Sequence, residues 1–344
     1  MSTSRKIPST VLTGFLGSGK TTLLNYILTA SHGKRIAVIE NEFGEIAIDN
    51  ALVLQTDEEI FEMSNGCCLC CTARTDLIRI LHTLLERRDR FDRIIIETSG
   101  LADPNPVAQT FFVDEEIAAN IELDAIVTLV DGLHIGGHLD EVESGGVGDE
   151  AFDQIAFADR LIINKMDLIG DEEVAKLTAR LRSINATAPI VTSSYAEVDL
   201  DSILGVGAFD LSHTMAIDPG WLMGEEHAHE PGLESVSLQQ AGDLDADELD
   251  RWLATLLEAR GDDIYRMKGI VAVSGDDRRH VIQGVHRIFE QRPVDPWGSE
   301  ARDSRVIFIG RNLDREELAR GLARCSANRT LAGAAGAPTL DKKS

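Results

Sequence analysis

Short apolar runs alternate with longer stretches of helical periodicity through the first 211 residues. The runs are rich in β-branched residues and predict strands at 10–12, 36–39, 93–96, 125–130, 161–163 and 190–192. Between them, apolar side chains recur with a helical period and predict helices at 21–30, 76–88, 106–119 and 172–185. Strands that are apolar on both faces are typical of a parallel sheet covered by helices on both sides. The pattern therefore predicts a doubly wound, mostly parallel α/β domain.

The character of the chain changes near residue 213. Prolines and glycines among acidic residues mark 213–232 as a linker. Beyond it, the pattern predicts strands at 234–239, 267–274, 280–288 and 305–309 and helices at 246–260 and 315–323. We therefore expect a first domain over 1–212, a smaller α+β domain over 233–325, and a disordered tail over 326–344.

The charge of the chain narrows the choice of partners. Its 344 residues include 58 Asp and Glu against 33 Lys and Arg, which gives a formal net charge of −25. A surface this acidic repels nucleic acid and anionic lipid and attracts cations, although the same charge also serves solubility. No apolar run approaches the roughly 20 residues that a membrane span needs. The sequence predicts a cytoplasmic protein that binds neither nucleic acid nor a membrane.

The first chemical motif joins the first strand to the first helix. Residues 14–22 read Gly-Phe-Leu-Gly-Ser-Gly-Lys-Thr-Thr, which is the Walker A pattern in its expected strand–helix context. The candidate phosphate-binding residues are Gly14, Gly17, Ser18, Gly19, Lys20, Thr21 and Thr22. The glycines let backbone N–H groups face the phosphates, Lys20 supplies a cation, and the Thr21 hydroxyl is a ligand for Mg²⁺. The first domain is therefore expected to be a P-loop NTPase.

A carboxylate and a glycine complete the predicted catalytic group. Glu97 ends the apolar strand at 93–96, beside the P-loop, where a Walker B acid holds or orients the Mg²⁺ shell. Gly100 offers a backbone N–H to the γ-phosphate and a pivot for a switch loop. The candidate catalytic residues are thus Lys20, Thr21, Glu97 and Gly100.

Base selection is assigned to the sequence Asn-Lys-Met-Asp that follows the strand at 161–163. A carboxylate placed as Asp167 can accept hydrogen bonds from N1–H and the 2-amino group of guanine, and adenine has a donor at neither position. Lys165 would lie over the base plane, and Asn164 completes the motif. Its order after the other two motifs predicts GTP rather than ATP.

Four of the five cysteines fall within residues 67–71, and the fifth, Cys325, lies far away. Cysteines this close are poorly placed to join distant segments, and thiolates are soft ligands that suit Zn²⁺ and its neighbours. In an extended loop Cys68 and Cys70 face the same side, so two thiolates can converge on one ion. The other ligands would be outside donors or water. A redox pair or a buried structural cluster is the alternative.

The loop after the strand at 36–39 can supply such donors. Glu40 and Glu45 flank a glycine turn at the position expected for a switch loop. A metal ion between this loop and the cysteines would respond to the nucleotide, because switch loops reorder when the γ-phosphate is lost. Solvated loop acids are the alternative interpretation of both glutamates.

Taken together, these motifs resemble those of the CobW-type metal-associated P-loop GTPases, most closely the YjiA-like branch. The likeness rests on residues 14–22, 40–45, 68–71, 97–104 and 164–167, and it continues through 265–269, 283–287, 295–298 and 306–310. It implies slow GTP hydrolysis and a metal site on a Cys-x-Cys-Cys motif. The implied ligands are Cys68, Cys70 and Cys71, with Glu40 and Glu45 beside one motif cysteine, here Cys70.

The resemblance implies a metallochaperone that transfers zinc to client metalloproteins. Cobalt is the alternative cargo, because other members serve cobalamin synthesis or activate metal-dependent nitrile hydratase, and insertion of cobalt or iron into one such client is a second hypothesis. A third hypothesis, of a different class, is a regulatory GTPase whose cysteines sense thiol oxidation. The client and the formation of a homo-oligomer stay open.

The chain departs from the family pattern in two places. Cys67 is an extra cysteine, and we assign the motif to residues 68–71 because Thr72 and the following helix continue that register. The long histidine-rich run of many relatives is reduced to His227 and His229 in an acidic linker, which we interpret as solvated. We assign no role to the helix-spaced pair His134 and His138, because two glycines separate them.

Overall fold

The chain divides into two units, Met1–Leu233 and Glu234–Ser344. The computed structural model describes residues 6–30, 32–40, 60–62, 72–143, 150–207 and 234–327. The predicted linker and nearly all of the predicted tail lie outside these ranges, as do Glu45 and the four clustered cysteines. No helix in the described ranges is long and apolar enough to span a membrane.

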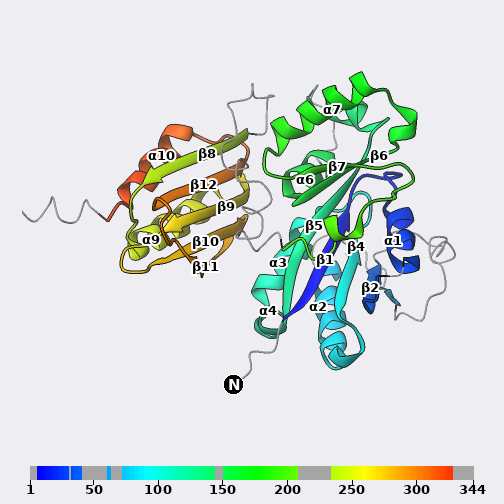
Figure 1. The fold of residues 1–344 in the computed structure, drawn as a ribbon, viewed down its shortest axis with the longest axis horizontal. Coiled ribbons are helices and arrows are strands. Elements are labelled where there is room, and N and C mark those ends of the chain that lie inside the picture. Colours follow the sequence, from blue (N-terminus) through cyan, green and yellow to red (C-terminus); the bar gives the residue numbers. More distant parts are fainter. Residues whose placement is uncertain are drawn as a thin grey trace, which may run out of the picture. The chain divides into compact units, whose positions relative to one another are not determined.

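A parallel sheet of seven strands forms the centre of the first unit (Figure 1). Its order is β3-β2-β4-β1-β5-β6-β7, and all neighbouring strands run parallel. The strands are β1 (Ile7–Thr13), β2 (Ile36–Glu40), β3 (Ile60–Glu62), β4 (Arg93–Glu97), β5 (Ile121–Asp131), β6 (Arg160–Asn164) and β7 (Ile190–Thr192). The central strands are buried almost throughout, which confirms the parallel architecture predicted from runs that are apolar on both faces.

The order of the strands creates a crevice for a ligand. After β1 the chain moves to one side of the sheet, and after β4 it crosses to the other side, where β5 lies beside β1. The carboxyl ends of the strands at such a switch point are where open α/β sheets bind ligands. The P-loop leaves β1 at this point.

Helices connect the strands of the first unit. They are α1 (Lys20–Thr29), α2 (Thr72–Leu85), α3 (Asn105–Val113), α4 (Glu115–Asn120), α5 (Ile135–Glu143), α6 (Glu150–Phe157) and α7 (Asp171–Ile184). The predicted single helix at 106–119 is wrong. Asp114 is extended, with φ −88° and ψ 120°, and its carboxylate accepts the backbone N–H groups of Glu116 and Ile117. It therefore ends α3 and caps α4.

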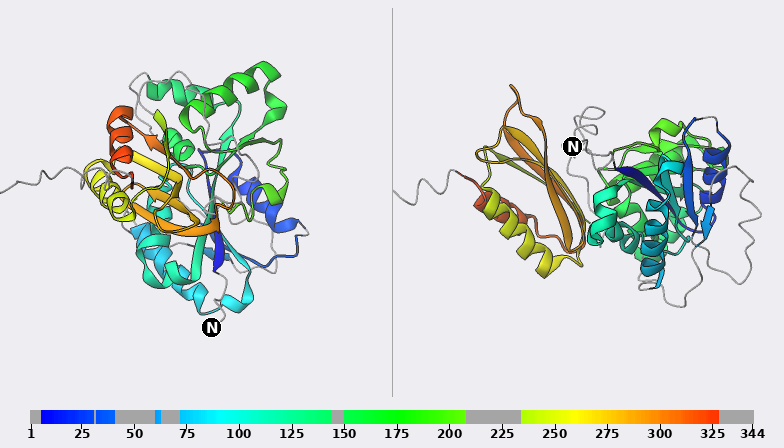
Figure 2. Two further views of the ribbon diagram at one scale, coloured as in Figure 1. Left: turned by 60° about the vertical axis from the view of Figure 1, so that its left-hand side comes forward. Right: turned by 90° about the horizontal axis from the view of Figure 1, so that it is seen from below.

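The second unit is a five-stranded antiparallel sheet with two helices on one face (Figure 2). The strand order is β11-β10-β9-β12-β8. The elements are β8 (Glu234–Ala241), α9 (Ala246–Arg260), β9 (Ile264–Ala272), β10 (Arg278–Val285), β11 (Ile288–Pro296), β12 (Asp303–Gly310) and α10 (Arg315–Arg324). Apolar residues of the helices, such as Leu253 and Leu322, pack with Met267 and Phe308 of the sheet. This arrangement confirms the predicted α+β class.

Two details of the second unit add to or correct the sequence analysis. The strand predicted at 280–288 is β10, but it ends at Val285, because the chain turns at His286, whose φ is 49°, and returns as β11, which was not predicted. Cys325 is buried at the end of α10, where its thiol donates to the Gly321 carbonyl at 3.3 Å. Burial raises the pKa of this thiol to about 11, so Cys325 is a structural residue rather than a reactive one.

Candidate nucleotide and metal site

The P-loop adopts a conformation that requires glycine. Gly14, Gly17 and Gly19 have φ angles of 138°, 74° and 108°. A side chain at Gly19 would also collide with the amide nitrogen of Asn164, so the loop could not pack against β6. The Ser18 hydroxyl is buried in this loop and has no hydrogen-bond partner among the described residues. A buried polar atom of this kind suits a loop that closes around a polar ligand.

Lys20 begins α1 and lies against the loop. Its side chain is only 8% exposed, and its ammonium group donates to the carbonyl oxygens of Gly14 at 2.8 Å and Phe15 at 3.3 Å. The cation is thus held in the curve of the P-loop, at the N-terminus of a helix. Both features favour an anion at this position. Thr22, on the first turn of the same helix, is exposed.

Thr21 and Glu97 meet where α1 passes the end of β4. The Thr21 hydroxyl donates to the Glu97 carboxylate at 3.2 Å. The parallel register pairs Glu97 with Leu12 on one side and with Glu40 on the other. A hydroxyl and a carboxylate at this separation are hard oxygen donors, which fit a Mg²⁺ ion that takes its remaining ligands from phosphate and water.

Gly100 lies directly against the P-loop. A side chain at this position would come within 2.8 Å of the Leu16 backbone nitrogen. The loop is held by Gln154 of α6, whose amide donates to the carbonyls of Gly100 and Ala102, both at 3.1 Å. Gln154 is fully buried, and sequence reasoning missed it because α6 was not predicted.

Asn164 connects the phosphate loop to the loop that follows β7. Its amide nitrogen donates to the Ser18 carbonyl at 2.9 Å. Its amide oxygen accepts from the Ser193 hydroxyl at 3.0 Å and from the Ala196 backbone N–H at 2.9 Å. The motif predicted to choose the base and the motif predicted to bind phosphate are therefore joined through one buried side chain. Asp167 lies exposed in the 3₁₀ turn Met166–Leu168 beside it.

Asp131, at the end of β5, holds Lys165 in place. Lys165 has a left-handed backbone, with φ 64°, and its ammonium donates to the Asp131 carboxylate at 2.7 Å. The same carboxylate accepts from the ring of His134 at 3.0 Å and from the Leu133 backbone N–H at 3.0 Å. Burial alone would raise the pKa of Asp131, but the hydrogen bonds from Lys165 and His134 outweigh it and hold this pKa below its usual value.

Sequence reasoning also missed Asp131, although a signal was available. An acidic residue directly after a buried strand lies at the edge of the sheet where the other motifs end. The structure also explains His134 and His138. Both fall on or beside α5, which forms in spite of Gly136 and Gly137, and the ring of His138 lies 4.3 Å from that of Phe15 in the P-loop.

The predicted metal site falls mostly outside the described residues. Cys68, Cys70, Cys71 and Glu45 lie there, and Glu40 alone is described. Glu40 is buried at the end of β2, in register with Glu97. Within the described ranges, no group of three or more His, Cys, Asp or Glu side chains is arranged to hold a metal ion. The assignment of a metal site to these residues stays a prediction.

Both units match known protein families. Residues 8–192 match the family described as CobW/HypB/UreG, nucleotide-binding domain. Residues 233–326 match the family described as Cobalamin synthesis protein cobW C-terminal domain. The two families occur here in one chain, in the order in which the two sheets follow each other.

Similar proteins share nearly the whole length of the chain. The zinc chaperone YjiA of Escherichia coli (strain K12) is 36% identical over 317 residues, which cover 91% of this chain and 96% of that protein. The zinc chaperone CobW of Pseudomonas aeruginosa is 36% identical over 355 residues, covering 94% and 92%. The crystal structure of Zn(II)-bound YjiA GTPase from E. coli has a TM-score of 0.72 and 30% identity, and the match covers 94% of this chain and 99% of that one.

Proposed function

The chain belongs to the CobW family, and on that premise we propose that it hydrolyses GTP and delivers zinc to client metalloproteins. The observation that best supports GTP binding is the set of hydrogen bonds that the Asn164 side chain makes. These bonds join the P-loop, through Ser18, to the loop after β7, through Ala196. One nucleotide can therefore place its phosphates in the first loop and its base beside the second.

The phosphate end of GTP is assigned to the P-loop. Backbone N–H groups of 14–22 and the N-terminus of α1 receive the phosphate oxygens. The Lys20 ammonium exchanges the Gly14 and Phe15 carbonyls, at 2.8 and 3.3 Å, for phosphate oxygens. Thr21 and Glu97 would hold Mg²⁺. When it is bound, this ion would neutralise part of the negative charge of the phosphates.

The base end is assigned to the residues that follow β6. Asp167 accepts from N1–H and the 2-amino group of guanine, and adenine would leave this carboxylate without donors. The stem of Lys165 covers the base, because its ammonium is drawn to Asp131 at 2.7 Å. The pair thus fixes the lysine in one position before the nucleotide arrives.

Hydrolysis takes place where the γ-phosphate meets 97–100. Glu97 orients the cation shell, and the Gly100 backbone N–H faces the γ-phosphate. Their role is mainly positioning and charge stabilisation, because phosphoryl transfer needs little covalent help from the protein. The absence of a side chain at Gly100 lets this loop approach Leu16 closely.

Zinc is assigned as cargo to Cys68, Cys70 and Cys71, with Glu40 and Glu45 as carboxylate donors. The location of Glu40 supports a link between zinc binding and the bound nucleotide, because the register of β2 and β4 pairs Glu40 with Glu97. Loss of the γ-phosphate would reorder the loop after Glu40 and release zinc to a client. Cobalt competes for the same soft ligands, and the zinc chaperones among the relatives favour zinc as the physiological ion.

A metal titration tests this function directly. Zinc affinity is measured with a chromophoric chelator for the GTP-bound, GDP-bound and nucleotide-free chain, and cobalt is titrated in parallel. Cys68→Ala and Cys70→Ala should lose most of the affinity, whereas Cys67→Ala, the matched control, should keep it. Equal zinc affinities in the GTP and GDP states would refute the coupling. Loss of affinity in Cys67→Ala would refute the assigned register.

A further inference from the structure

One strongly exposed aromatic residue lies in the loop that follows β7. Tyr195 is 71% exposed, more than any other large hydrophobic residue in the described ranges. Within those ranges its side chain has no hydrogen-bond, ion-pair or ring partner. Neither the core of the first unit nor the residues assigned to GTP make use of this ring. The ring thus needs a separate explanation.

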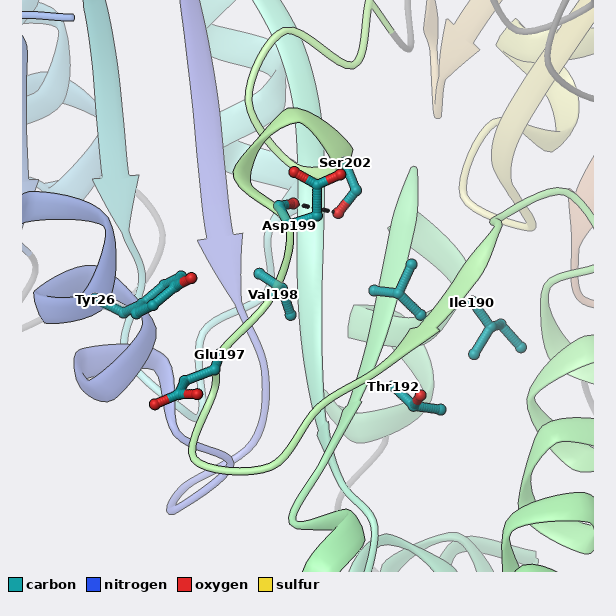
Figure 3. Close-up of a pocket in the computed structure, with 8 residues that line it drawn as sticks. Tyr26, Ile190, Thr192, Glu197, Val198, Asp199 and Ser202 are labelled. Carbon is teal, nitrogen blue, oxygen red and sulfur yellow. Dashed lines mark hydrogen bonds between the residues drawn. The ribbon is translucent and has the colours of Figure 1, made fainter. Parts of the chain in front are cut away.

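The backbone at Tyr195 has a conformation that tyrosine rarely adopts. The Glu197 N–H donates to the Ser194 carbonyl at 3.2 Å and closes a four-residue turn. Tyr195 and Ala196 are its two central residues, and both have positive φ angles, 56° and 58°. Glycine, asparagine and aspartate are usual at such positions. Figure 3 shows the chain on either side of this turn, leaving β7 at Thr192 and returning as Glu197 beside α1. Because residues held in such strained conformations cluster at functional sites, the turn is a candidate ligand contact.

Hydrogen bonds fix both ends of the turn to the base-selecting motif. The Ser193 carbonyl accepts from the backbone N–H of Met166 at 3.1 Å. The Ala196 N–H donates to the side-chain oxygen of Asn164 at 2.9 Å. Tyr195 lies between these two anchors, so its position is set by the same motif that is assigned to guanine.

The order of the strands places Tyr195 and Lys165 on opposite sides of that motif. β6 lies between β5 and β7 in the sheet. The Lys165 ammonium is drawn towards β5, where it donates to Asp131 at 2.7 Å. Tyr195 belongs to the turn after β7, on the other side. A guanine held by Asp167 at the end of β6 therefore has the stem of Lys165 on one side and this turn on the other.

We propose that the ring of Tyr195 stacks on the guanine base, on the face opposite the stem of Lys165. The inference rests on the proposed binding of GTP and adds a residue that sets its affinity. Stacking would bury the exposed ring face. Because every base has a π-face, stacking contributes affinity without reading the hydrogen-bonding groups of the base. The choice of guanine therefore stays with Asp167, and Tyr195 holds the base that Asp167 selects.

Calorimetric titration of the full chain with GDP and with inosine diphosphate, which lacks the 2-amino group, tests this role. Loss of a stacked aromatic ring weakens nucleotide binding by about 5- to 150-fold, and we expect about tenfold for Tyr195→Ala. Both nucleotides should lose affinity by the same factor, because stacking does not read the 2-amino group. Tyr195→Phe should keep the affinity of the wild type. Urea unfolding of both variants should match the wild type, because the side chain is exposed.

Tyr195→Asn separates the ring from the backbone. Asparagine tolerates a positive φ but cannot stack in the same way, so this variant should bind GDP as weakly as Tyr195→Ala. Tyr195→Trp supplies a spectroscopic signal, because guanine stacked on the new indole should quench its fluorescence when GDP is added.

Three results would overturn the proposal. They are full GDP affinity in Tyr195→Ala, restored affinity in Tyr195→Asn, and a loss that differs between GDP and inosine diphosphate. The last would show that the turn acts on the hydrogen bonds of Asp167 rather than on the base plane. The wild type is titrated beside the variants, so the two levels of the argument are distinguishable. Failure of the wild type to bind GDP would refute the proposed function, whereas normal binding by the wild type and Tyr195→Ala alike would refute the stacking alone.

Discussion

Replacing Asp131 by Asn separates the charge of this residue from its shape. The buried carboxylate accepts from Lys165 at 2.7 Å, from the His134 ring at 3.0 Å and from the Leu133 backbone N–H at 3.0 Å. Asparagine keeps one acceptor oxygen for the backbone but loses the negative charge. Lys165 then loses the carboxylate that holds its ammonium group, and with it the position over the base that we propose.

The expected loss of binding free energy follows from the environment of the Asp131–Lys165 pair. A hydrogen bond between charged groups contributes about 1.5–3 kcal/mol. Lys165 is 29% exposed, so water screens part of this interaction, and we place the loss near the lower end, at about 1–2 kcal/mol. That range corresponds to binding of GTP and GDP that is about 5- to 30-fold weaker. Because both nucleotides lose the same contact, KM should rise while kcat stays constant.

Titration with a fluorescent GDP analogue and steady-state phosphate release measure these changes. A double-mutant cycle with Lys165→Ala is the decisive step, because Asp131→Asn should then have little further effect. The full effect of Asp131→Asn in the Lys165→Ala background would refute the reasoning. His134→Ala is the control for the other side-chain partner. The pKa of Asp131 lies below its usual value of 3.8, so its contribution is present above that pH and should not vary across the neutral range.

Three further changes address other parts of the structure. Asn164→Ala should lower the stability of the nucleotide-free chain by about 2 kcal/mol, because buried partners lose their hydrogen bonds; unchanged urea unfolding would contradict this. Gly100→Ala should slow phosphate release while leaving GDP affinity intact, because the added methyl group meets the Leu16 backbone; equal turnover would show that the loop has room. The hydrogen bond to Asp114 raises the pKa of His82 above 6.5. Its stabilisation, about 0.5 kcal/mol for a pair this exposed, is therefore complete below pH 6.5 and lost as the pH rises through the raised pKa; His82→Gln should lower urea stability only on the acidic side.

The architecture could be predicted because burial on both faces of a strand leaves a plain pattern in the sequence. The runs at 36–39 and 161–163 became β2 and β6 with only small changes at their ends. The errors arose where tertiary contacts override local preference. Helix α5 contains Gly136 and Gly137, which disfavour a helix by about 1 kcal/mol each, but Leu139 is buried and Arg180 donates to the Gly136 carbonyl at 3.1 Å.

Two turns were missed because neither carries the usual residues. The break between α3 and α4 has no glycine or proline, and Asp114 makes it by capping the second helix. The hairpin between β10 and β11 turns at His286 and Arg287, again without glycine. Apolar residues recur on both sides of each turn, so spacing alone could not locate the turns.

The candidate site, like the fold, could be predicted only in part. The motifs predicted which residues gather at the carboxyl edge of the sheet, because each motif follows a strand. They could not predict the hydrogen bonds between motifs, since Asn164 and Ser18 are far apart in sequence and meet only when β1, β5 and β6 assemble. Gln154 gave no signal at all, because a glutamine in an unrecognised helix has no motif. The four clustered cysteines lie outside the described residues, so their arrangement stays a prediction.

The register of the parallel strands bears on how the two halves of the proposed function communicate. Glu40 and Glu97 occupy paired positions at the ends of β2 and β4, and neighbouring strands lie about 4.8 Å apart. A zinc ion on Glu40 and a magnesium ion on Glu97 would then interact strongly, because two divalent cations at such distances repel each other unless anionic phosphate lies between them. GTP supplies that charge, and its hydrolysis and the departure of phosphate remove part of it. If zinc is released after hydrolysis as proposed, the release would require no long relay through the fold, since one ladder of backbone hydrogen bonds pairs Glu40 with Glu97. Glu40→Gln should accordingly reduce the difference in zinc affinity between the GTP and GDP states more than it reduces GTP affinity itself.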